Sequence, residues 1–82
     1  MKYNRDFYYI YEPNICGGKT IIINGNTGEV YKTNIIGCKI LDCIYDNEDI
    51  TIDEISTLLK IQESTCDAFL DKFVEAGIVS IV

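Results

Sequence analysis

The chain has 82 residues, with seven basic and thirteen acidic side chains, four cysteines and no histidine, and 48% of its residues are hydrophobic. That length is typical of one small domain and leaves little room for a deep catalytic pocket. Without histidine, the chain also lacks the side chain most often used as a general acid or base near neutral pH. We therefore expect a single stand-alone domain over residues 1–82, with no catalytic role and no cofactor.

No apolar run is long enough for a secretory signal or for the roughly 20 residues of a membrane span. We expect a cytoplasmic protein without a membrane partner. In that reducing compartment the four cysteines, Cys16, Cys38, Cys43 and Cys66, are expected to be free thiols. Their spacing contains no Cys-x2-Cys pair, so no metal site is predicted. Cys16, which lies near Lys19, is the candidate for a reactive thiol.

The first part of the chain has the pattern of β-strands. Residues 7–11 and 19–24 are rich in aromatic and β-branched side chains, and residues 29–33 follow the turn-forming segment NGNTG. These segments predict a three-stranded antiparallel sheet, with a loop at Pro13 and the glycine pair after it between the first two strands. NGNTG leads into a strand and lacks the lysine of a phosphate-binding loop, so it is interpreted as a hairpin turn.

From Asn34 onward the hydrophobic period changes to about 3.6 residues, which predicts helices. Asn34 is expected to cap the first helix. Thr51 and Glu54 form a capping-box pattern that predicts the start of the second helix, and Ile50 and Ile55 form the accompanying hydrophobic staple. The apolar stripes expected to be buried on these two helices are Ile36, Ile40, Leu41 and Ile44, and Ile52, Ile55, Leu58 and Leu59.

Ser64 is expected to cap a third helix that ends at Gly77. Its apolar face contains Cys66, Phe69, Leu70, Phe73 and Val74. The apolar residues 78–82 are interpreted either as a strand added to the sheet or as a tail folded over the core. The predicted fold class is α+β, similar to a winged helix-turn-helix, with a three-stranded antiparallel sheet followed by three helices.

Charge is distributed unevenly along the chain. Residues 1–41 carry five basic and three acidic side chains, whereas residues 42–82 carry two lysines and ten acids. In a winged helix the third helix would contact DNA, but here its polar positions include Asp67, Asp71 and Glu75 against Lys72 alone. Because DNA affinity comes largely from Lys and Arg, this composition predicts no nucleic-acid partner.

The strand at residues 29–33 offers another kind of site. If its edge is open beside an apolar helix, its backbone could bind an extended peptide by strand addition. A covered edge would have the same sequence, so the residues leave both possibilities open.

Three segments, GEVYKTNIIGCKILDCI, DITIDEISTLL and FLDKFVEAGIV, resemble the PqqD-like family, also called RiPP recognition elements, over roughly residues 19–82. The resemblance rests on the order and spacing of Gly28, Tyr31, Asn34, Gly37, Ile40, Leu41, Thr51, Glu54, Ile55, Phe69, Leu70, Phe73 and Gly77. Thr33 stands where the family usually has leucine, and Ile36 where it often has threonine.

The resemblance implies a winged-helix domain that binds the leader segment of a ribosomally made precursor peptide. The domain would act as a peptide chaperone and present the leader to a separate radical SAM maturase, cyclodehydratase or leader peptidase. The implied peptide-binding residues are Glu29, Val30, Tyr31, Lys32 and Thr33 on the strand, and Asp67, Leu70, Asp71, Phe73 and Val74 on the third helix. If the acidic flank of that helix lines the groove, a basic residue in the leader is the complement. The alternative is a winged-helix transcription regulator or another protein-interaction domain.

Overall fold

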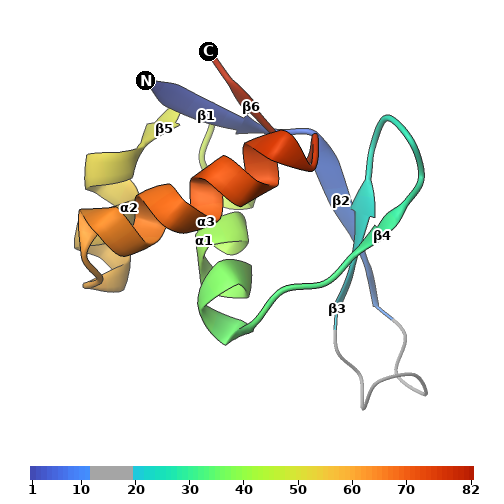
Figure 1. Cartoon of the computed structure of the whole chain (residues 1–82), viewed down its shortest axis with the longest axis horizontal. Coiled ribbons are helices and arrows are strands. Elements are labelled where there is room, and N and C mark those ends of the chain that lie inside the picture. The colour runs from blue at the N-terminus through green and yellow to red at the C-terminus, as the bar shows by residue number, and fades with distance from the viewer. Residues whose placement is uncertain (12–19) are drawn as a thin grey trace.

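The computed structural model describes residues 1–11 and 20–82 and places two three-stranded antiparallel sheets around three helices (Figure 1). One sheet has the order β5-β1-β6 and contains β1 (Lys2–Arg5), β5 (Ile50–Thr51) and β6 (Val79–Ile81). The other has the order β2-β3-β4 and contains β2 (Phe7–Tyr11), β3 (Thr20–Asn24) and β4 (Val30–Tyr31). The helices are α1 (Ile35–Asp46), α2 (Ile52–Leu59) and α3 (Glu63–Glu75). The predicted α+β class is confirmed.

The β2-β3-β4 sheet is the one that the sequence predicts. Tyr8 pairs with Ile23, and Ile22 pairs with Tyr31. The segment between β3 and β4 is a tight turn, in which Gly28 has a φ of 76° that glycine adopts without strain. β4 is shorter than the predicted strand at 29–33, because the chain leaves β3 after Tyr31 and turns into α1.

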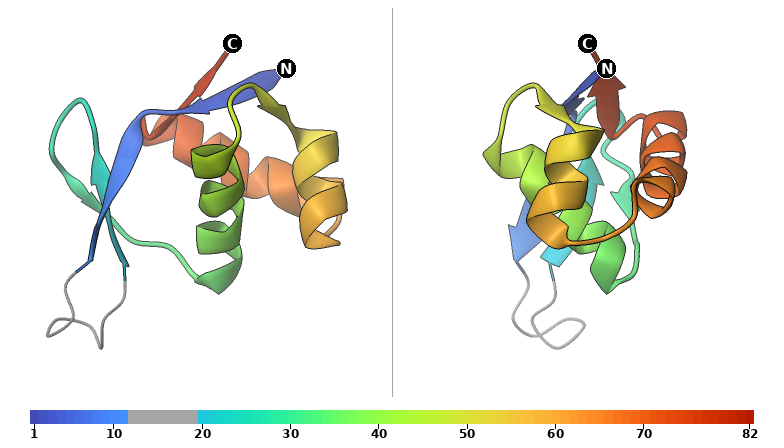
Figure 2. Two further views of the ribbon diagram at one scale, coloured as in Figure 1. Left: turned by 180° about the vertical axis from the view of Figure 1, so that it is seen from behind. Right: turned by 90° about the vertical axis from the view of Figure 1, so that its left-hand side faces the viewer.

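The β5-β1-β6 sheet is not predicted, although residues 78–82 were expected to be either a strand or a tail. Tyr3 in the central strand pairs with Ile50 on one side and Ile81 on the other. β1 and β2 are consecutive and form one bent segment that connects the two sheets (Figure 2). At the bend, the amide of Asp6 donates to the carbonyl of Ile78 at 2.8 Å, and the Asp6 carbonyl accepts from the amide of Gly25 at 2.7 Å.

The starts of α1 and α2 are those expected. The side chain of Asn34 accepts a hydrogen bond from the amide of Gly37 at 2.9 Å, and Thr51 and Glu54 form a complete capping box. The prediction that Ser64 caps α3 is wrong, since the N-cap is Gln62, two residues earlier, and it makes no side-chain cap. Lys60, in the left-handed conformation, ends α2 and brings the chain into α3 at this earlier position.

The core lies between the helices and both sheets. Its buried cluster consists of Tyr3, Phe7, Ile22, Ile40, Leu41, Ile44, Ile50, Ile55, Cys66, Leu70, Phe73, Ile78 and Val79. Two residues expected in buried stripes lie at the surface instead, because Ile36 is 41% exposed and Leu58 is 62% exposed. In α2, only Ile55 is buried, so this eight-residue helix packs through a narrower stripe than its sequence suggests.

The candidate reactive thiol Cys16, its neighbour Lys19 and the predicted loop at Pro13 lie outside the described residues. Within residues 1–11 and 20–82, none of the helices is both long and apolar enough to cross a membrane.

Candidate functional site

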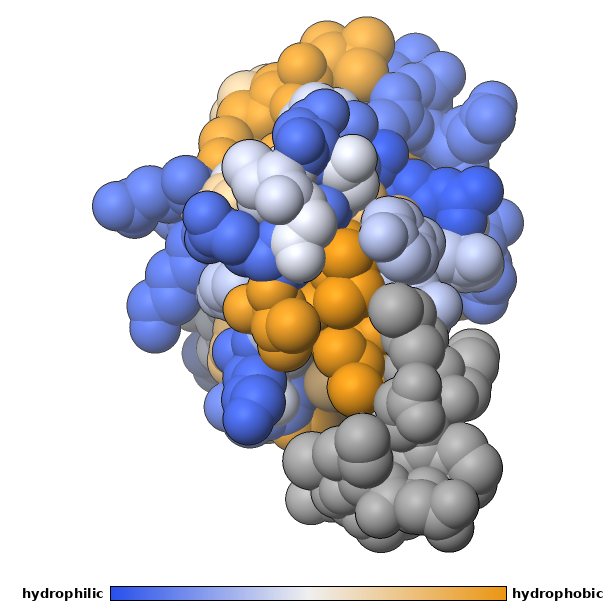
Figure 3. All heavy atoms as spheres, turned by 90° about the vertical axis from the view of Figure 1, so that its right-hand side faces the viewer, coloured by the Kyte–Doolittle hydropathy of each residue, from blue (hydrophilic) through white to orange (hydrophobic). Residues whose placement is uncertain are grey.

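Two surfaces carry the residues that the sequence singles out: the edge of the β2-β3-β4 sheet at β4, and the exposed face of α3. On the side of the molecule where the β2-β3-β4 sheet lies, Figure 3 shows an apolar patch bordered by polar side chains. Val30 on β4 and Tyr8 on β2 are exposed apolar side chains of this sheet.

In the described part of the chain, β4 is one of the two edge strands of its sheet. The amide of Asn24 donates to the carbonyl of Glu29 at 2.9 Å, which makes this a hydrogen-bonded pair. Because such pairs alternate along an antiparallel ladder, Val30 directs its own amide and carbonyl away from β3. The backbone groups of Val30 are therefore the ones placed to accept an added strand.

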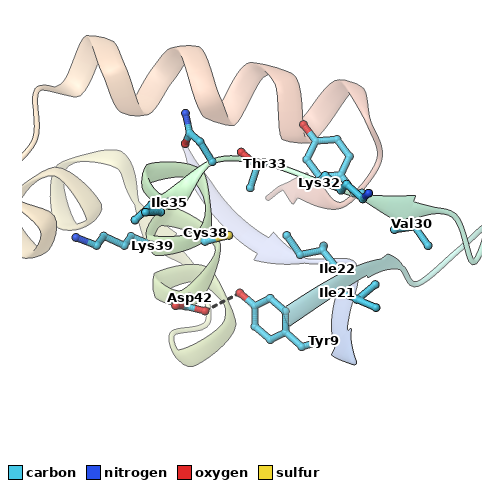
Figure 4. Close-up of a pocket in the computed structure, with 12 residues that line it drawn as sticks. Tyr9, Ile21, Ile22, Val30, Lys32, Thr33, Ile35, Cys38, Lys39 and Asp42 are labelled. Atoms are coloured by element: carbon cyan, nitrogen blue, oxygen red, sulfur yellow. Dashed lines mark hydrogen bonds between the residues drawn. The ribbon is translucent and has the colours of Figure 1, made fainter. Parts of the chain in front are cut away.

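Beyond Tyr31, the chain separates from β3 and leaves a space that we call the fork pocket (Figure 4). Its volume is about 750 Å³, and α1 lies on its far side. The pocket is lined by Tyr9, Ile21, Ile22, Val30, Tyr31, Lys32, Thr33, Asn34, Ile35, Cys38, Lys39 and Asp42.

Two of the polar groups in the fork pocket are already hydrogen-bonded. The hydroxyl of Tyr9 donates to Oδ1 of Asp42 at 2.7 Å, which joins β2 to α1 (Figure 4). The side-chain oxygen of Asn34 caps α1. Burial and the nearby Asp42 carboxylate raise the pKa of the Cys38 thiol, so it stays protonated near neutral pH.

The close approach of the β4-to-α1 connection depends on Gly37. A Cβ atom at this position would overlap the side chain of Thr33. The first turn of α1 therefore packs closely against the β4-to-α1 connection, and both line the fork pocket.

The implied peptide-binding residues do not form one surface. The strand residues Val30, Tyr31, Lys32 and Thr33 line the fork pocket, whereas Glu29 and the five residues on α3 do not. Leu70 and Phe73 are buried in the core, Val74 is half-buried, and Asp67 and Asp71 are exposed. The link between the two groups is an edge-to-face contact between the rings of Tyr31 and Phe73, whose centroids are 5.9 Å apart.

Sequence reasoning missed the residues of α1 and β2 that complete the pocket. Ile35, Cys38, Lys39 and Asp42 recur at spacings of three and four, which is the spacing of one helix face. That spacing was a usable signal, but nothing local shows that this face lies against Tyr9.

The exposed face of α3 carries two rows of side chains. The first consists of Glu63, Asp67, Asp71 and Glu75 at four-residue intervals, which we call the acidic row. The second, the neutral-to-basic row, consists of Ser64, Ala68 and Lys72. Because residues four apart are neighbours on a helix, the four carboxylates form one stripe.

The acidic row affects the ionisation of neighbouring groups. Burial, with repulsion from Asp67 and Asp71, raises the pKa of Tyr3. A hydrogen bond with the Asp53 side chain, with repulsion from its charge, raises the pKa of Glu63. The acidic row therefore lies close to Asp53 of α2 at its Glu63 end and close to Tyr3 of β1 at its middle.

Within the described ranges, no three His, Cys, Asp or Glu side chains are grouped so that they could hold a metal ion. Cys38, Cys43 and Cys66 are free thiols. Cys66 is fully buried in the core, and burial raises its pKa.

Comparison with known proteins gives one match. Residues 33–80, from the end of the β4 connection through Ser80 in β6, match the family described as winged helix-turn-helix DNA-binding. No curated protein and no solved structure matches the chain significantly. The match supports the winged-helix part of the predicted resemblance, without singling out the PqqD-like family. It contradicts the expectation that the chain has no nucleic-acid partner, because a local excess of acidic residues does not outweigh the sequence pattern of the whole segment.

Proposed function

The chain belongs to the winged helix-turn-helix DNA-binding family, and from this membership we propose that it is a non-enzymatic transcription regulator that contacts duplex DNA through α3. The family match is the observation that carries the proposal. It spans α2, the turn at Lys60 and α3, and in a helix-turn-helix the second of these helices lies in the major groove while the first crosses the DNA backbone.

The charges of α3 restrict how DNA would be contacted. The acidic row would repel phosphates, so the neutral-to-basic row with Ser64 and Lys72, together with Lys60 in the turn, is the side that faces DNA. Two lysines neutralise about two phosphates. The logarithm of the association constant should therefore fall with the logarithm of salt concentration with a slope of only about −2.

The test is selection of binding sequences from a pool of randomised duplexes, followed by fluorescence anisotropy over a range of KCl concentrations. We expect an enriched sequence and the shallow salt slope. The double variant Lys60→Glu and Lys72→Glu should abolish binding, and Lys39→Glu on α1 serves as the control with a charge change elsewhere. If no sequence is enriched and no duplex binds even at low salt, the DNA-binding proposal is wrong.

Removing the repulsion should have the opposite effect. The variant in which Glu63, Asp67, Asp71 and Glu75 are replaced by the corresponding amides should bind duplex DNA at least about tenfold more tightly at low salt, because four negative charges beside the DNA-facing row are removed. Unchanged affinity would mean that α3 does not face the DNA.

A second candidate function is favoured by the open edge of β4. There the outward-directed backbone groups of Val30 would pair with an extended segment, such as the leader of a ribosomally made precursor peptide. The chain would then hold the leader for a separate radical SAM maturase, cyclodehydratase or leader peptidase. Strand addition orders a flexible leader and raises its effective concentration at that enzyme.

Two substitutions at one position separate strand addition from side-chain contacts. Val30→Pro removes the outward amide, while Val30→Ala keeps it and removes only the side chain. The probe is the leader peptide of a precursor encoded beside this gene, titrated while the backbone amide shifts of the protein are recorded. We expect Val30→Pro to lose binding and Val30→Ala to retain most of it. Equal affinities for both variants would count against strand addition.

A further inference from the structure

We propose that the fork pocket binds a small amphipathic organic anion, a carboxylate with an apolar body, independently of DNA or peptide binding. The pocket lies where β3 and the chain after Tyr31 separate, so it is formed by the fold and not by the exposed outer edge of β4 (Figure 4). Its volume of about 750 Å³ is within the range of small-molecule sites.

The wall of the pocket is mostly apolar. Ile21 and Ile22 from β3, Val30 from β4, and Ile35 from α1 supply aliphatic surface around it. Ile35 is 75% exposed and Val30 is 59% exposed, so covering them with a ligand removes apolar area from water. The protonated thiol of Cys38 adds a further small apolar contact.

The charges around the pocket select the sign of the ligand. Among the described residues, the charged ones that line it are Lys32, Lys39 and Asp42. The Asp42 carboxylate keeps its negative charge while it accepts the Tyr9 hydroxyl, so the formal net charge of the lining is +1. In Figure 4 Asp42 lies beside Tyr9, away from Lys32 on the opposite side of the pocket. In Figure 4 the Lys39 side chain is directed away from the strands, so Lys32 is the principal partner for a carboxylate.

The neighbouring pocket does not have these properties. It measures about 440 Å³ and is lined by Asp42 and Asp46 against Lys39, with Leu58 and Leu59 as its apolar part. Two carboxylates against one lysine give its lining a formal net charge of −1, which would repel an anion. The fork pocket is therefore the one whose apolar wall and positive opening occur together.

Ligand binding in the fork pocket would be detected on α3. Tyr31 lines the pocket, and its ring contacts the ring of Phe73 at a centroid separation of 5.9 Å. A ligand that contacts Tyr31 should therefore change the NMR signals of the Phe73 ring.

Three probes with the same ten-carbon body test the proposal: decanoate, 1-decanol and decylammonium, each below its micellar concentration. Titration of isotope-labelled protein should show decanoate shifting the amides of residues 30–39 and the ring signals of Phe73. We expect decanoate to bind about 5- to 10-fold more tightly than the alcohol, and decylammonium to bind most weakly.

Substitutions test where the ligand binds and which ligand charge the pocket prefers. Lys32→Glu should weaken decanoate binding about 5- to 10-fold and reverse the preference toward decylammonium. Lys39→Glu should have a smaller effect, and Lys72→Glu on α3 is the matched control that should have none. Cys38→Phe should fill the pocket and weaken all three probes. Because that variant could unfold, its amide spectrum is compared with the wild type, and Ile35→Gln on the exposed rim provides a second test.

The outcomes are distinct. Equal affinity for the three probes, or an unchanged preference in Lys32→Glu, would overturn the choice of an anion. Shifts confined to residues away from 30–39 would overturn the site. Neither result bears on DNA binding by α3 or on peptide binding at the outer edge of β4, which are measured with their own probes.

Discussion

Asn24 is the residue that ties the β2-β3-β4 sheet to the end of α3. It is a buried polar residue, 6% exposed. Its Oδ1 accepts hydrogen bonds from the amides of Asn26 and Thr27, at 2.8 and 3.2 Å, and thereby closes the turn after β3. Its Nδ2 donates to the carbonyl of Ala76 at 3.0 Å, beside the left-handed Gly77 that ends the helix. One side chain thus satisfies backbone groups from two elements.

Replacing Asn24 by alanine should lower the free energy of unfolding by about 2 kcal/mol, because buried donors and acceptors lose their partners. Urea denaturation followed by circular dichroism measures the change. Asn26→Ala in the same turn is the control, since the Asn26 side chain is exposed and only its amide is used. A loss below about 0.5 kcal/mol for Asn24→Ala would show that water replaces these hydrogen bonds.

At the scale of the element, α2 has eight residues, a length at which an isolated helix is not stable in water. Its start is held by the capping box of Thr51 and Glu54, in which the amide of each residue donates to the side chain of the other. Thr51 also ends β5 and pairs with Lys2 of β1. The cap therefore fixes both the start of the helix and its connection to the sheet.

We expect Thr51→Ala to lower the free energy of unfolding by about 1 kcal/mol, the usual cost of removing a side-chain cap. Thr57→Ala, at an exposed position within the same helix, is the matched control and should change stability little or raise it slightly. Equal stability of Thr51→Ala and the wild type, measured by urea denaturation, would mean that packing of Ile55 alone sets the start of α2.

The elements predicted correctly are those with local signals. The hairpin turn before β4, the Asn34 cap and the capping box depend on residues within five positions of each other. The β5-β1-β6 sheet was missed because Tyr3 finds its partners at Ile50 and Ile81, and no local pattern encodes such pairs. The fork pocket was missed for the same reason, because it depends on where the chain separates from β3 after Tyr31.

At the scale of the whole molecule, several groups with raised pKa values lie in or against one core. Burial is the main cause for Tyr3, Cys38, Cys43 and Cys66, and nearby carboxylates add to it at each of them. A group whose pKa is raised by folding binds its proton more tightly in the folded state. Its contribution to stability is complete below the unfolded pKa and is lost as the pH rises through the folded value.

The free energy of unfolding should therefore decrease as the pH rises above about 9, while it changes little from these groups at neutral pH. Guanidinium denaturation at several pH values, with a reductant present, measures this. In Cys66→Val the buried thiol is absent, so the alkaline loss should be smaller than in the wild type. The same pH dependence in both proteins would show that Cys66 does not contribute to it.

The position of β1 at the centre of its sheet also has a consequence for the order of folding. Ser80 donates to the carbonyl of Asn4, a pair 76 residues apart in sequence, and the other neighbour of β1 is β5. Contacts between such distant residues form slowly, because a long loop must close first. During synthesis, β1 leaves the ribosome before either of its neighbours, so it cannot pair until β5 and then β6 have been made. The helices of residues 35–75 can form earlier from local contacts, so we expect closure of the β5-β1-β6 sheet to be a late step of folding.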